Sequence, residues 1–407
     1  MTEPMRCHGM RDILPDEMRR FRRIEQAFRQ VCLGWGYREI RTPTIEHLYL
    51  FTSAGTLSPQ MLERVYSFLD WDGWSGERVV LRPDSTIPAA RLYLEHLSES
   101  QRAKLFYVQN VFRFAQGDES REDWQCGVEL TGDTQPEGDV ELILMACETL
   151  ERLGLPVEVK LSDPGILRAV LEQAGFDLSE QLALYDRLLE GDLGALDDVQ
   201  SRLAGPGVSL RGLLTVEGEG SRYLNNLRSA LATAVPAIAR PLDELATVSD
   251  VVAEVGIAHK IAPILVRNFE YYTGPVFHLF VGETKVGGGG RYDALLAVLG
   301  DLAVPASGFA LEMELLSKLV VETPDEELPA IAVRYEGADG RPLGNAFSLA
   351  RALRSAGRVV EISRSARPAA REVTVTEDAF LVTVNGSRPR RLSRIEDVVE
   401  ALSADRP

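Results

Sequence analysis

Short β-rich runs recur along the first part of this chain at irregular intervals, and this spacing most constrains the fold. The runs lie at residues 37–43, 78–81, 105–114, 126–131 and 157–161. Repeated βαβ units would place a helix of similar length after each strand. The irregular spacing instead predicts an α+β fold, in which helices pack beside an antiparallel sheet.

Helical periodicity occupies the segments between these runs. Phe21, Ile24, Phe28 and Val31 follow one another at spacings of three and four residues, which predicts a helix over 15–35. Further helices are predicted at 87–97 and 140–153.

A long helical stretch then interrupts the sheet-like sequence. Between residues 164 and 256 the leucines keep helical spacing, and β-rich runs return only at 262–266 and 276–281. The glycine run 287–290 is predicted to form a turn. We therefore expect a core in two parts, 1–163 and 257–321, separated by a helical insertion, 164–256.

A polar linker precedes a small C-terminal α/β domain, expected over residues 329–407. Its strands are predicted at 330–334, 359–362 and 380–384, and its helices at 346–356 and 394–402. This segment carries thirteen arginines against ten acidic residues, whereas the whole chain has a net charge of -17. So strong a negative charge argues against general nucleic-acid binding, because phosphate contacts need Lys and Arg.

The sequence also indicates the cellular compartment. No run of 18 apolar residues is present, and the first eight residues lack the apolar stretch of a secretory signal. The four cysteines are scattered, which predicts reduced thiols and no zinc site. We expect a cytoplasmic protein without a metal or a cofactor.

Two segments carry polar side chains next to predicted elements. Asp84, Ser85 and Thr86 stand just before a helix, where Ser85 or Thr86 capping the helix is the favoured interpretation. The alternative is that Asp84 and Thr86 accept an ammonium group. Further along, Gln125 and Glu129 share one face of a strand, so they line either a small ligand site or an exposed surface.

Two further segments are weak by themselves. The tyrosine pair Tyr271-Tyr272 follows Arg267, and such pairs more often pack in a core or an interface. The run from Gly287 to Asp293 is explained by a tight turn alone.

Taken together and in order, these segments resemble histidyl-tRNA synthetases and their non-catalytic relatives, the regulatory subunits of ATP phosphoribosyltransferase. The resemblance runs from His8 to Leu316. Residues 42–46 resemble motif 1 of class II synthetases, which forms part of a dimer interface in that family. Arg113, Arg121 and Gln125 resemble motif 2, and residues 308–316 resemble motif 3. Residues 267–272 and 288–293 resemble two signatures specific to histidine enzymes.

The resemblance implies roles for individual residues. Asp84, Thr86 and Gln125 would hold the α-amino group of free histidine, and Arg267 would face its carboxylate. Glu129 and Tyr272 would bind the imidazole, with Tyr271 in the same site. Arg113 and Arg121 would remain from an ATP site. These pairings are chemically coherent, since each ligand group meets a partner of opposite charge or matching hydrogen-bond sense.

Departures from the family pattern argue against catalysis. Leu315 stands where motif 3 has an arginine that clamps ATP, and Glu312 stands where it has glycine. Losing a charge-assisted hydrogen bond costs about 1.5–3 kcal/mol. A carboxylate beside the phosphates adds roughly a few kcal/mol of repulsion at an effective dielectric constant near 20. We therefore expect adenylate formation to be disabled and no residue to be catalytic.

The resemblance thus implies a regulatory subunit in the first step of histidine synthesis. It would activate a short-form catalytic subunit of ATP phosphoribosyltransferase and confer inhibition by L-histidine, as a homodimer within a hetero-oligomer. Binding of tRNA is not expected. Two alternatives stay open: a working histidine–tRNA ligase with divergent motifs, and a paralogue with another amino acid or partner. The C-terminal domain, placed like a degenerate anticodon-binding domain, favours the ligase, because many regulatory subunits lack it.

Overall fold

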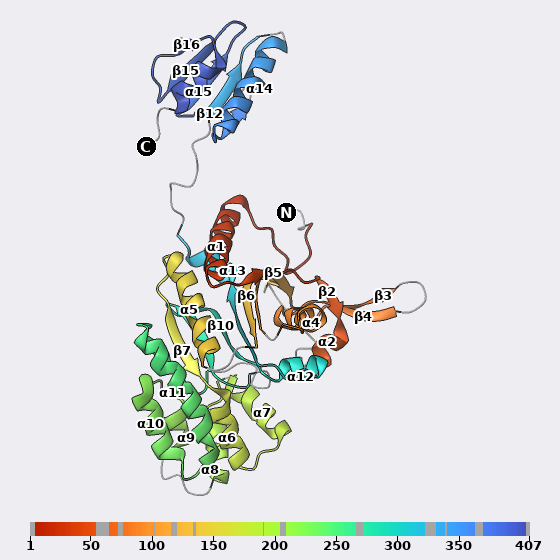
Figure 1. The fold of residues 1–407 in the computed structure, drawn as a ribbon, viewed down its shortest axis with the longest axis vertical. Helices are drawn as coiled ribbons and strands as arrows, with labels where there is room; N and C mark the ends of the chain where they lie inside the picture. Colours follow the sequence, from red (N-terminus) through yellow and green to blue (C-terminus); the bar gives the residue numbers. More distant parts are fainter. Residues whose placement is uncertain are drawn as a thin grey trace. The chain divides into compact units, whose positions relative to one another are not determined.

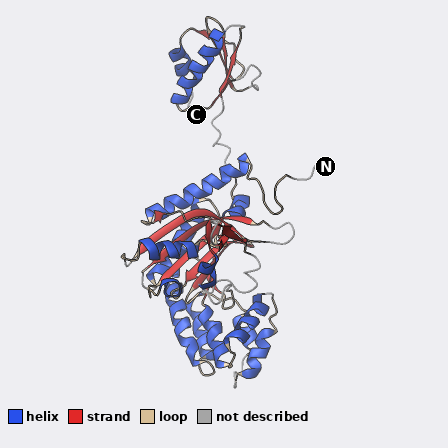
Figure 2. Cartoon of the chain, turned by 90° about the vertical axis from the view of Figure 1, so that its right-hand side faces the viewer, coloured by secondary structure: helices blue, strands red, loops and turns tan. Residues whose placement is uncertain are grey.

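The computed structural model divides into two compact units, Met1–Val320 and Val321–Pro407. It describes residues 5–53, 65–71, 76–100, 102–114, 120–132, 136–189, 191–203, 209–265, 272–321, 331–337, 340–362 and 369–403. Figure 1 follows the chain through both units, and Figure 2 shows the first unit's strands as a layer with helices beside it.

An eight-stranded sheet forms the centre of the first unit. In spatial order its strands are β1 (Arg38–Glu39), β5 (Ala103–Phe112), β6 (Glu122–Thr131), β11 (Ala306–Glu312), β10 (Thr284–Arg291), β9 (Val276–Val281), β7 (Glu158–Ser162) and β8 (His259–Ile261). The pairs from β5 to β7 are antiparallel, whereas β1–β5 and β7–β8 are parallel. The predicted α+β class, with an antiparallel sheet and flanking helices, is confirmed.

The helices of this unit pack on this sheet, on the smaller sheet described below and on one another. They are α1 (Pro15–Gly34), α2 (Leu48–Ser53), α4 (Thr86–His96), α5 (Glu137–Arg152), α12 (Leu295–Gly300) and α13 (Met313–Leu319). In α1, Pro15 opens the first turn, where its missing N–H costs nothing. The ring of Phe28 meets the β5 ring of Phe106 edge to face, with 5.9 Å between centroids. Such contacts join α1 to the sheet in one core.

Two predictions about the strands of the main sheet are wrong. The glycine run 287–290 forms half of strand β10 instead of a turn. A Cβ at Gly287 would lie 2.5 Å from the carbonyl oxygen of Ala310, so glycine is needed there for close strand packing. The run predicted at 262–266 is also misplaced, because β8 ends at Ile261, where its short pairing with β7 stops.

A smaller antiparallel sheet stands beside the main one. Its strands, in spatial order, are β2 (Ile45–His47), β4 (Gly76–Leu81) and β3 (Ser67–Trp71). All five residues of β3 are exposed.

The helical segment lies between β7 and β8. It comprises α6 (Pro164–Gln173), α7 (Leu178–Leu189), α8 (Ala195–Arg202), α9 (Leu210–Leu214), α10 (Gly220–Leu231), the 3-10 helix η1 (Pro236–Ile238) and α11 (Ala239–Glu254). Its leucines join the core of the main sheet. Helix α11 contacts both α5 and β7, and Figure 1 shows these elements side by side.

The second unit has its own sheet and its own core. The strands, in spatial order, are β13 (Val360–Ile362), β12 (Ile331–Tyr335), β14 (Arg371–Val375), β15 (Phe380–Val384) and β16 (Arg390–Leu392). Helices α14 (Gly340–Ser355) and α15 (Ile395–Ser403) pack on this sheet. Across the described parts of both units, no helix combines the length and the apolar character needed to span a bilayer.

Candidate functional site

Glu129 lies in the middle of the main sheet and accepts hydrogen bonds from two tyrosines. Its side chain is 5% exposed. The hydroxyl of Tyr107, on neighbouring β5, donates to Oε1 at 3.0 Å, and the hydroxyl of Tyr292, just after β10, donates to Oε2. Both carboxyl oxygens therefore accept a hydrogen bond, one from neighbouring β5 and one from the end of β10, two strands away.

One glycine on β6 and one on neighbouring β11 make room for this arrangement. Gly127 pairs with Tyr107 across β5 and β6, and the Tyr107 ring occupies the space of a Cβ at Gly127. Gly308 lies opposite Glu129 on β11, where a Cβ would overlap both the carboxyl group and the Tyr292 hydroxyl. Side chains at 127 and 308 would therefore prevent the two tyrosines from reaching Glu129.

Asp84 and Thr86 approach the same carboxyl group from the N-terminus of α4. Asp84 Oδ1 accepts from the backbone N–H of Ile87 at 2.9 Å, whereas Ser85 makes no capping bond. The prediction that Ser85 or Thr86 caps the helix is thus wrong, because the longer carboxyl side chain reaches the free N–H. Thr86 hydrogen-bonds to Glu129, and Tyr107 feels the charges of both acids.

Burial dominates the electrostatics of these groups. It raises the pKa of Glu129 well above its ordinary value, and the charge of Asp84 raises it further, against the lowering effect of the Thr86 hydrogen bond. Burial also raises the pKa of Asp84, while the Ile87 hydrogen bond and the charge of Arg113 lower it. Two desolvated acids close together favour a cationic ligand or a shared proton.

Tyr272 completes a group of residues that we call the Glu129 cluster. Burial raises the pKa of Tyr272, and the charges of Asp84 and Glu129 raise it further, so its phenol lies near both acids. The cluster comprises Asp84, Thr86, Tyr107, Glu129, Tyr272 and Tyr292. Tyr107, Glu129 and Tyr292 are buried, whereas Asp84, Thr86 and Tyr272 are partly exposed, so solvent reaches the cluster from their side.

The other predicted site residues fall into three groups. Gln125 is buried on the same β6 face as Glu129, opposite Glu312 on β11. Arg113 lies beside Asp84, since its Nε donates to the carbonyl oxygen of Pro83 at 2.9 Å. Arg267 and Tyr271 lie outside the described residues, so their predicted roles stay predictions.

Arg121 is held by the N-terminal segment. Its guanidinium lies 4.4 Å from the ring centroid of Phe114, and its backbone N–H donates to the carbonyl oxygen of Gly9 at 2.9 Å. The Arg121 side chain also fills the space beside Gly9, which has a φ of +73°. Arg121 is therefore packed against residues 8–10 at the start of β6.

The region of motif 3 is acidic. Leu315 lies on α13, and the preceding residue, Glu314, is buried and accepts the backbone N–H of Trp124 at 2.9 and 3.0 Å. Burial raises the pKa of Glu314 to about 7, and the charge of Asp123 raises it as well. Arg11 approaches Glu314 only to 3.9 Å and is hydrogen-bonded to Glu17 at 2.8 Å.

Reasoning from the sequence missed two residues of the cluster. Tyr107 could have been found, because Tyr107 and Gln109 are the polar side chains on one otherwise apolar face of β5. Tyr292 was noted only as part of a signature. Its contact with Glu129, 163 residues away, depends on the order β6-β11-β10 in the sheet.

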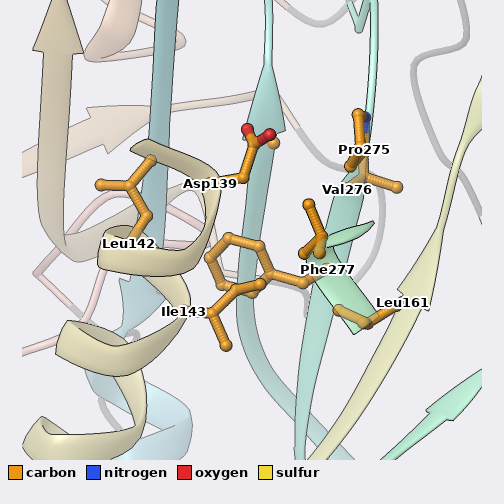
Figure 3. Close-up of a pocket in the computed structure, with 9 residues that line it drawn as sticks. Asp139, Leu142, Ile143, Leu161, Pro275, Val276 and Phe277 are labelled. Carbon is orange, nitrogen blue, oxygen red and sulfur yellow. The ribbon is translucent and has the colours of Figure 1, made fainter. Parts of the chain in front are cut away.

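A small pocket lies close to the cluster without including any of its residues. It is lined by Asp139, Leu142 and Ile143 of α5, Leu161 of β7, Val248 of α11, and Pro275, Val276, Phe277 and Gly290 (Figure 3). Its interior has room for about one water molecule. We place the candidate ligand site at the Glu129 cluster, because the pocket wall is apolar apart from Asp139. No group of three or more metal-binding side chains occurs in the described ranges.

Comparisons with known proteins identify the family of this chain. Residues 9–316 match the family model described as histidyl-tRNA synthetase. The chain belongs to the histidyl-tRNA synthetase family. An ATP phosphoribosyltransferase regulatory subunit from Dehalococcoides mccartyi is 45% identical over 88% of this chain and 87% of its own length. A histidine–tRNA ligase from Desulforudis audaxviator is 34% identical over 86% of this chain and 83% of its own length.

A solved structure shows the same fold. It is described as an ATP phosphoribosyltransferase regulatory subunit/histidyl-tRNA synthetase from Bacillus halodurans, with 27% identity and a TM-score of 0.75. The match covers 89% of this chain and 93% of that one. The histidyl-tRNA synthetase fold thus accounts for most of the present chain.

Proposed function

We propose that this chain is a non-catalytic regulatory subunit of ATP phosphoribosyltransferase. It activates a short-form catalytic subunit and makes that enzyme sensitive to inhibition by L-histidine. The observation that carries the proposal is the contrast between two parts of one sheet. The Glu129 cluster retains acids and hydroxyls suited to histidine, whereas the motif 3 region has Leu315 in place of a phosphate-binding arginine, next to the buried Glu314.

The chemistry of the cluster suits free histidine. Asp84 and Thr86 lie near the N-terminus of α4, where an acid and a hydroxyl accept bonds from an ammonium group. Glu129 and Tyr272 offer oxygens to the ring nitrogens of imidazole. Gln125 is assigned to the α-amino group, and Arg267 to the carboxylate. Tyr271 is assigned to the same site.

The motif 3 region does not suit a triphosphate. Glu314 and Asp123 place carboxyl groups near each other there, and the guanidinium of Arg11 is engaged by Glu17. Anionic phosphates would be repelled by these acids and would lack the clamp that Leu315 has replaced. The name of the 45% identical relative supports the same conclusion.

The test is a reconstitution assay. Formation of phosphoribosyl-ATP by the matching short-form catalytic subunit is measured alone, with this chain, and with this chain plus L-histidine. We expect stimulation by the chain and its reversal by histidine. A folded catalytic subunit that shows no response to the chain would overturn the proposal.

A second candidate is a working histidine–tRNA ligase. Arg113 beside Asp84 favours it, since this arginine could still meet a phosphate. The 34% identical ligase also favours it. Histidine-dependent exchange between ATP and pyrophosphate distinguishes the two candidates, because clear exchange requires adenylate formation. Calorimetry with other amino acids tests whether a paralogue has changed its ligand.

The assembly is also proposed. A homodimer through residues 42–46, within a hetero-oligomer with the catalytic subunit, follows from the resemblance of this segment to motif 1. Sedimentation of the chain alone and with the catalytic subunit tests both associations. A monomer at micromolar concentration would exclude the homodimer.

A further inference from the structure

A buried arginine joins the Glu129 cluster to the helical insertion. Arg291 is 3% exposed and directly precedes Tyr292, whose hydroxyl donates to Glu129. Its guanidinium forms ion pairs with Asp139 of α5 and with Glu244 of α11, where Nη1 and Oε2 are 2.7 Å apart. The side chain therefore connects the end of β10 with two helices on one side of the sheet.

Backbone hydrogen bonds extend this connection to Tyr272. The carbonyl oxygen of Arg291 accepts from the N–H of Thr273 at 2.8 Å. The hydroxyl of Thr273 accepts from the N–H of Asp293 at 2.9 Å. The Arg291 side chain also fills the space beside Gly274. Tyr272 and Tyr292 thus lie on two backbone segments that are hydrogen-bonded to each other. Thr273 makes both of these bonds, one to Arg291 and one to Asp293.

A second helix of the insertion contacts the same segments. Arg168 of α6 donates to the carbonyl oxygen of Tyr272 at 3.3 Å. Tyr272 and Tyr292 are therefore linked to α6 through Arg168 and to α11 through Glu244. A shift of the insertion must move these contacts or break them.

The packing at this junction is incomplete. The pocket of Figure 3 lies between α5, α11 and β9, and Asp139 stands in its wall with Pro275 and Val276. A void leaves the atoms around it without contacts on one side. The void therefore leaves Val248 of α11 without packing contacts on one side.

We infer that Arg291 is a positioning residue that couples ligand binding at the Glu129 cluster to the placement of helix α11. The inference rests on the proposed binding of histidine at this cluster. Histidine binds best when Tyr272 and Tyr292 are in place, and the ion pair between Arg291 and Glu244 favours that arrangement. Coupling is reciprocal, so a partner that displaces α11 lowers the affinity for histidine, and histidine opposes that displacement. The position of α11 in the helical insertion would thus depend on whether histidine is bound, and a protein that contacts α11 would respond to that difference.

The variant Glu244→Gln tests the coupling in the full-length chain. It removes one of the two carboxylates that pair with Arg291. The buried ion pair with Asp139 remains, so the guanidinium keeps a counter-ion. We expect L-histidine binding, measured by calorimetry, to weaken roughly fivefold or more. Glu244→Asp, which restores the carboxylate, should recover part of the affinity.

Two control variants separate this effect from general damage to α11. Arg240→Gln removes the exposed partner of Glu244, and Asp243→Asn removes a carboxylate that pairs with Arg228 on the helix surface. Both should bind histidine within about twofold of the wild type. Equal affinities for the wild type and Glu244→Gln would overturn the coupling.

Hydrogen exchange supplies a readout that a purely structural role would not change. Histidine should protect amides of α11 in the wild type, and this ligand-dependent protection should be lost in Glu244→Gln. Binding of histidine without any change in α11 overturns the coupling alone. A wild type that binds no histidine overturns the proposed ligand and the coupling together.

Discussion

Glu129 is a carboxyl group removed from water and surrounded by hydroxyl donors. Burying an ionised carboxylate is costly unless hydrogen bonds or a counter-charge replace the lost water. The hydroxyls of Tyr107 and Tyr292 replace part of that hydration. Asp84 is a second acid in the Glu129 cluster. None of the described residues of the cluster carries a positive charge. A ligand with N–H donors and positive charge would compensate both acids.

Replacing Glu129 by glutamine should weaken histidine binding by about 2 kcal/mol or more, because the variant loses a charged acceptor in a buried site. Calorimetry with L-histidine measures the change. Glu148→Gln is the matched control, since Glu148 lies on the surface of α5 and bonds Trp35 and Arg152. Unchanged affinity in Glu129→Gln would place the histidine site elsewhere.

Glu314 should make stability depend on pH. Its pKa rises from 4.5 to about 7 on folding, chiefly because it is buried. The folded state therefore holds this proton more tightly, and its contribution is present below pH 4.5 and is lost as the pH rises to about 7. Relative to Glu314→Gln, the unfolding free energy of the wild type should fall by up to roughly 3 kcal/mol over this range.

Urea unfolding at several pH values measures this difference. Glu254→Gln, which removes an exposed carboxylate, is the control and should follow the wild type. Parallel pH profiles for the wild type and Glu314→Gln would show that Glu314 has an ordinary pKa.

Strand β10 shows how an element can depend on what it packs against. Its four consecutive glycines lie between β9 and β11, and a Cβ at Gly288 would come within 2.5 Å of the Phe277 carbonyl oxygen. Glycine is poor in strands for entropic reasons. Here the close approach of both neighbours outweighs that cost. The position of Tyr292 against Glu129 follows from this close packing.

Gly289→Ala should destabilise the first unit by about 2 kcal/mol or more, since the methyl group would overlap the Gly308 carbonyl and the Phe309 side chain. Thermal and urea unfolding measure the loss. Gly34→Ala at the end of α1 is the matched control, because nothing lies within 4 Å of the added methyl group. That change should be neutral or stabilising by up to about 1 kcal/mol. Equal stability of the two variants would contradict the close packing of β10.

Helices were easier to predict than the strands around the site. The spacing of Phe21, Ile24 and Phe28 is enough to predict α1, because the backbone hydrogen bonds of a helix form within the helix itself. A strand depends on its partners. The run at 287–290 offered no apolar alternation, so only its neighbours β9 and β11 identify it as a strand.

At the scale of the molecule, the described residues of the Glu129 cluster all belong to the first compact unit. The unit Val321–Pro407 has a separate core, which includes Ile331, Val373 and Val398. Each unit buries its own apolar residues and so has the means to fold by itself.

A chain that ends after Val321 should therefore fold and bind L-histidine within about twofold of the full-length affinity. Circular dichroism checks the fold and calorimetry checks the binding. A folded truncated chain that has lost histidine binding would show that the C-terminal unit contributes to the site. Adding the truncated chain to the reconstitution assay would then reveal whether that unit is needed for activation.

Local pattern alone determined the helices, the α+β class and the family of this protein, because periodicity and motif spacing are properties of short segments. The resemblance to the family, and not the pattern of any one segment, implied that Asp84, Thr86, Glu129 and Tyr272 share a site. Tertiary structure decided which groups surround Glu129, because Tyr107 and Tyr292 reach it only through the strand order β5-β6-β11-β10. It also decided that Arg291 joins β10 to α11, since an ion pair between distant segments depends on how they pack and leaves no period in the sequence.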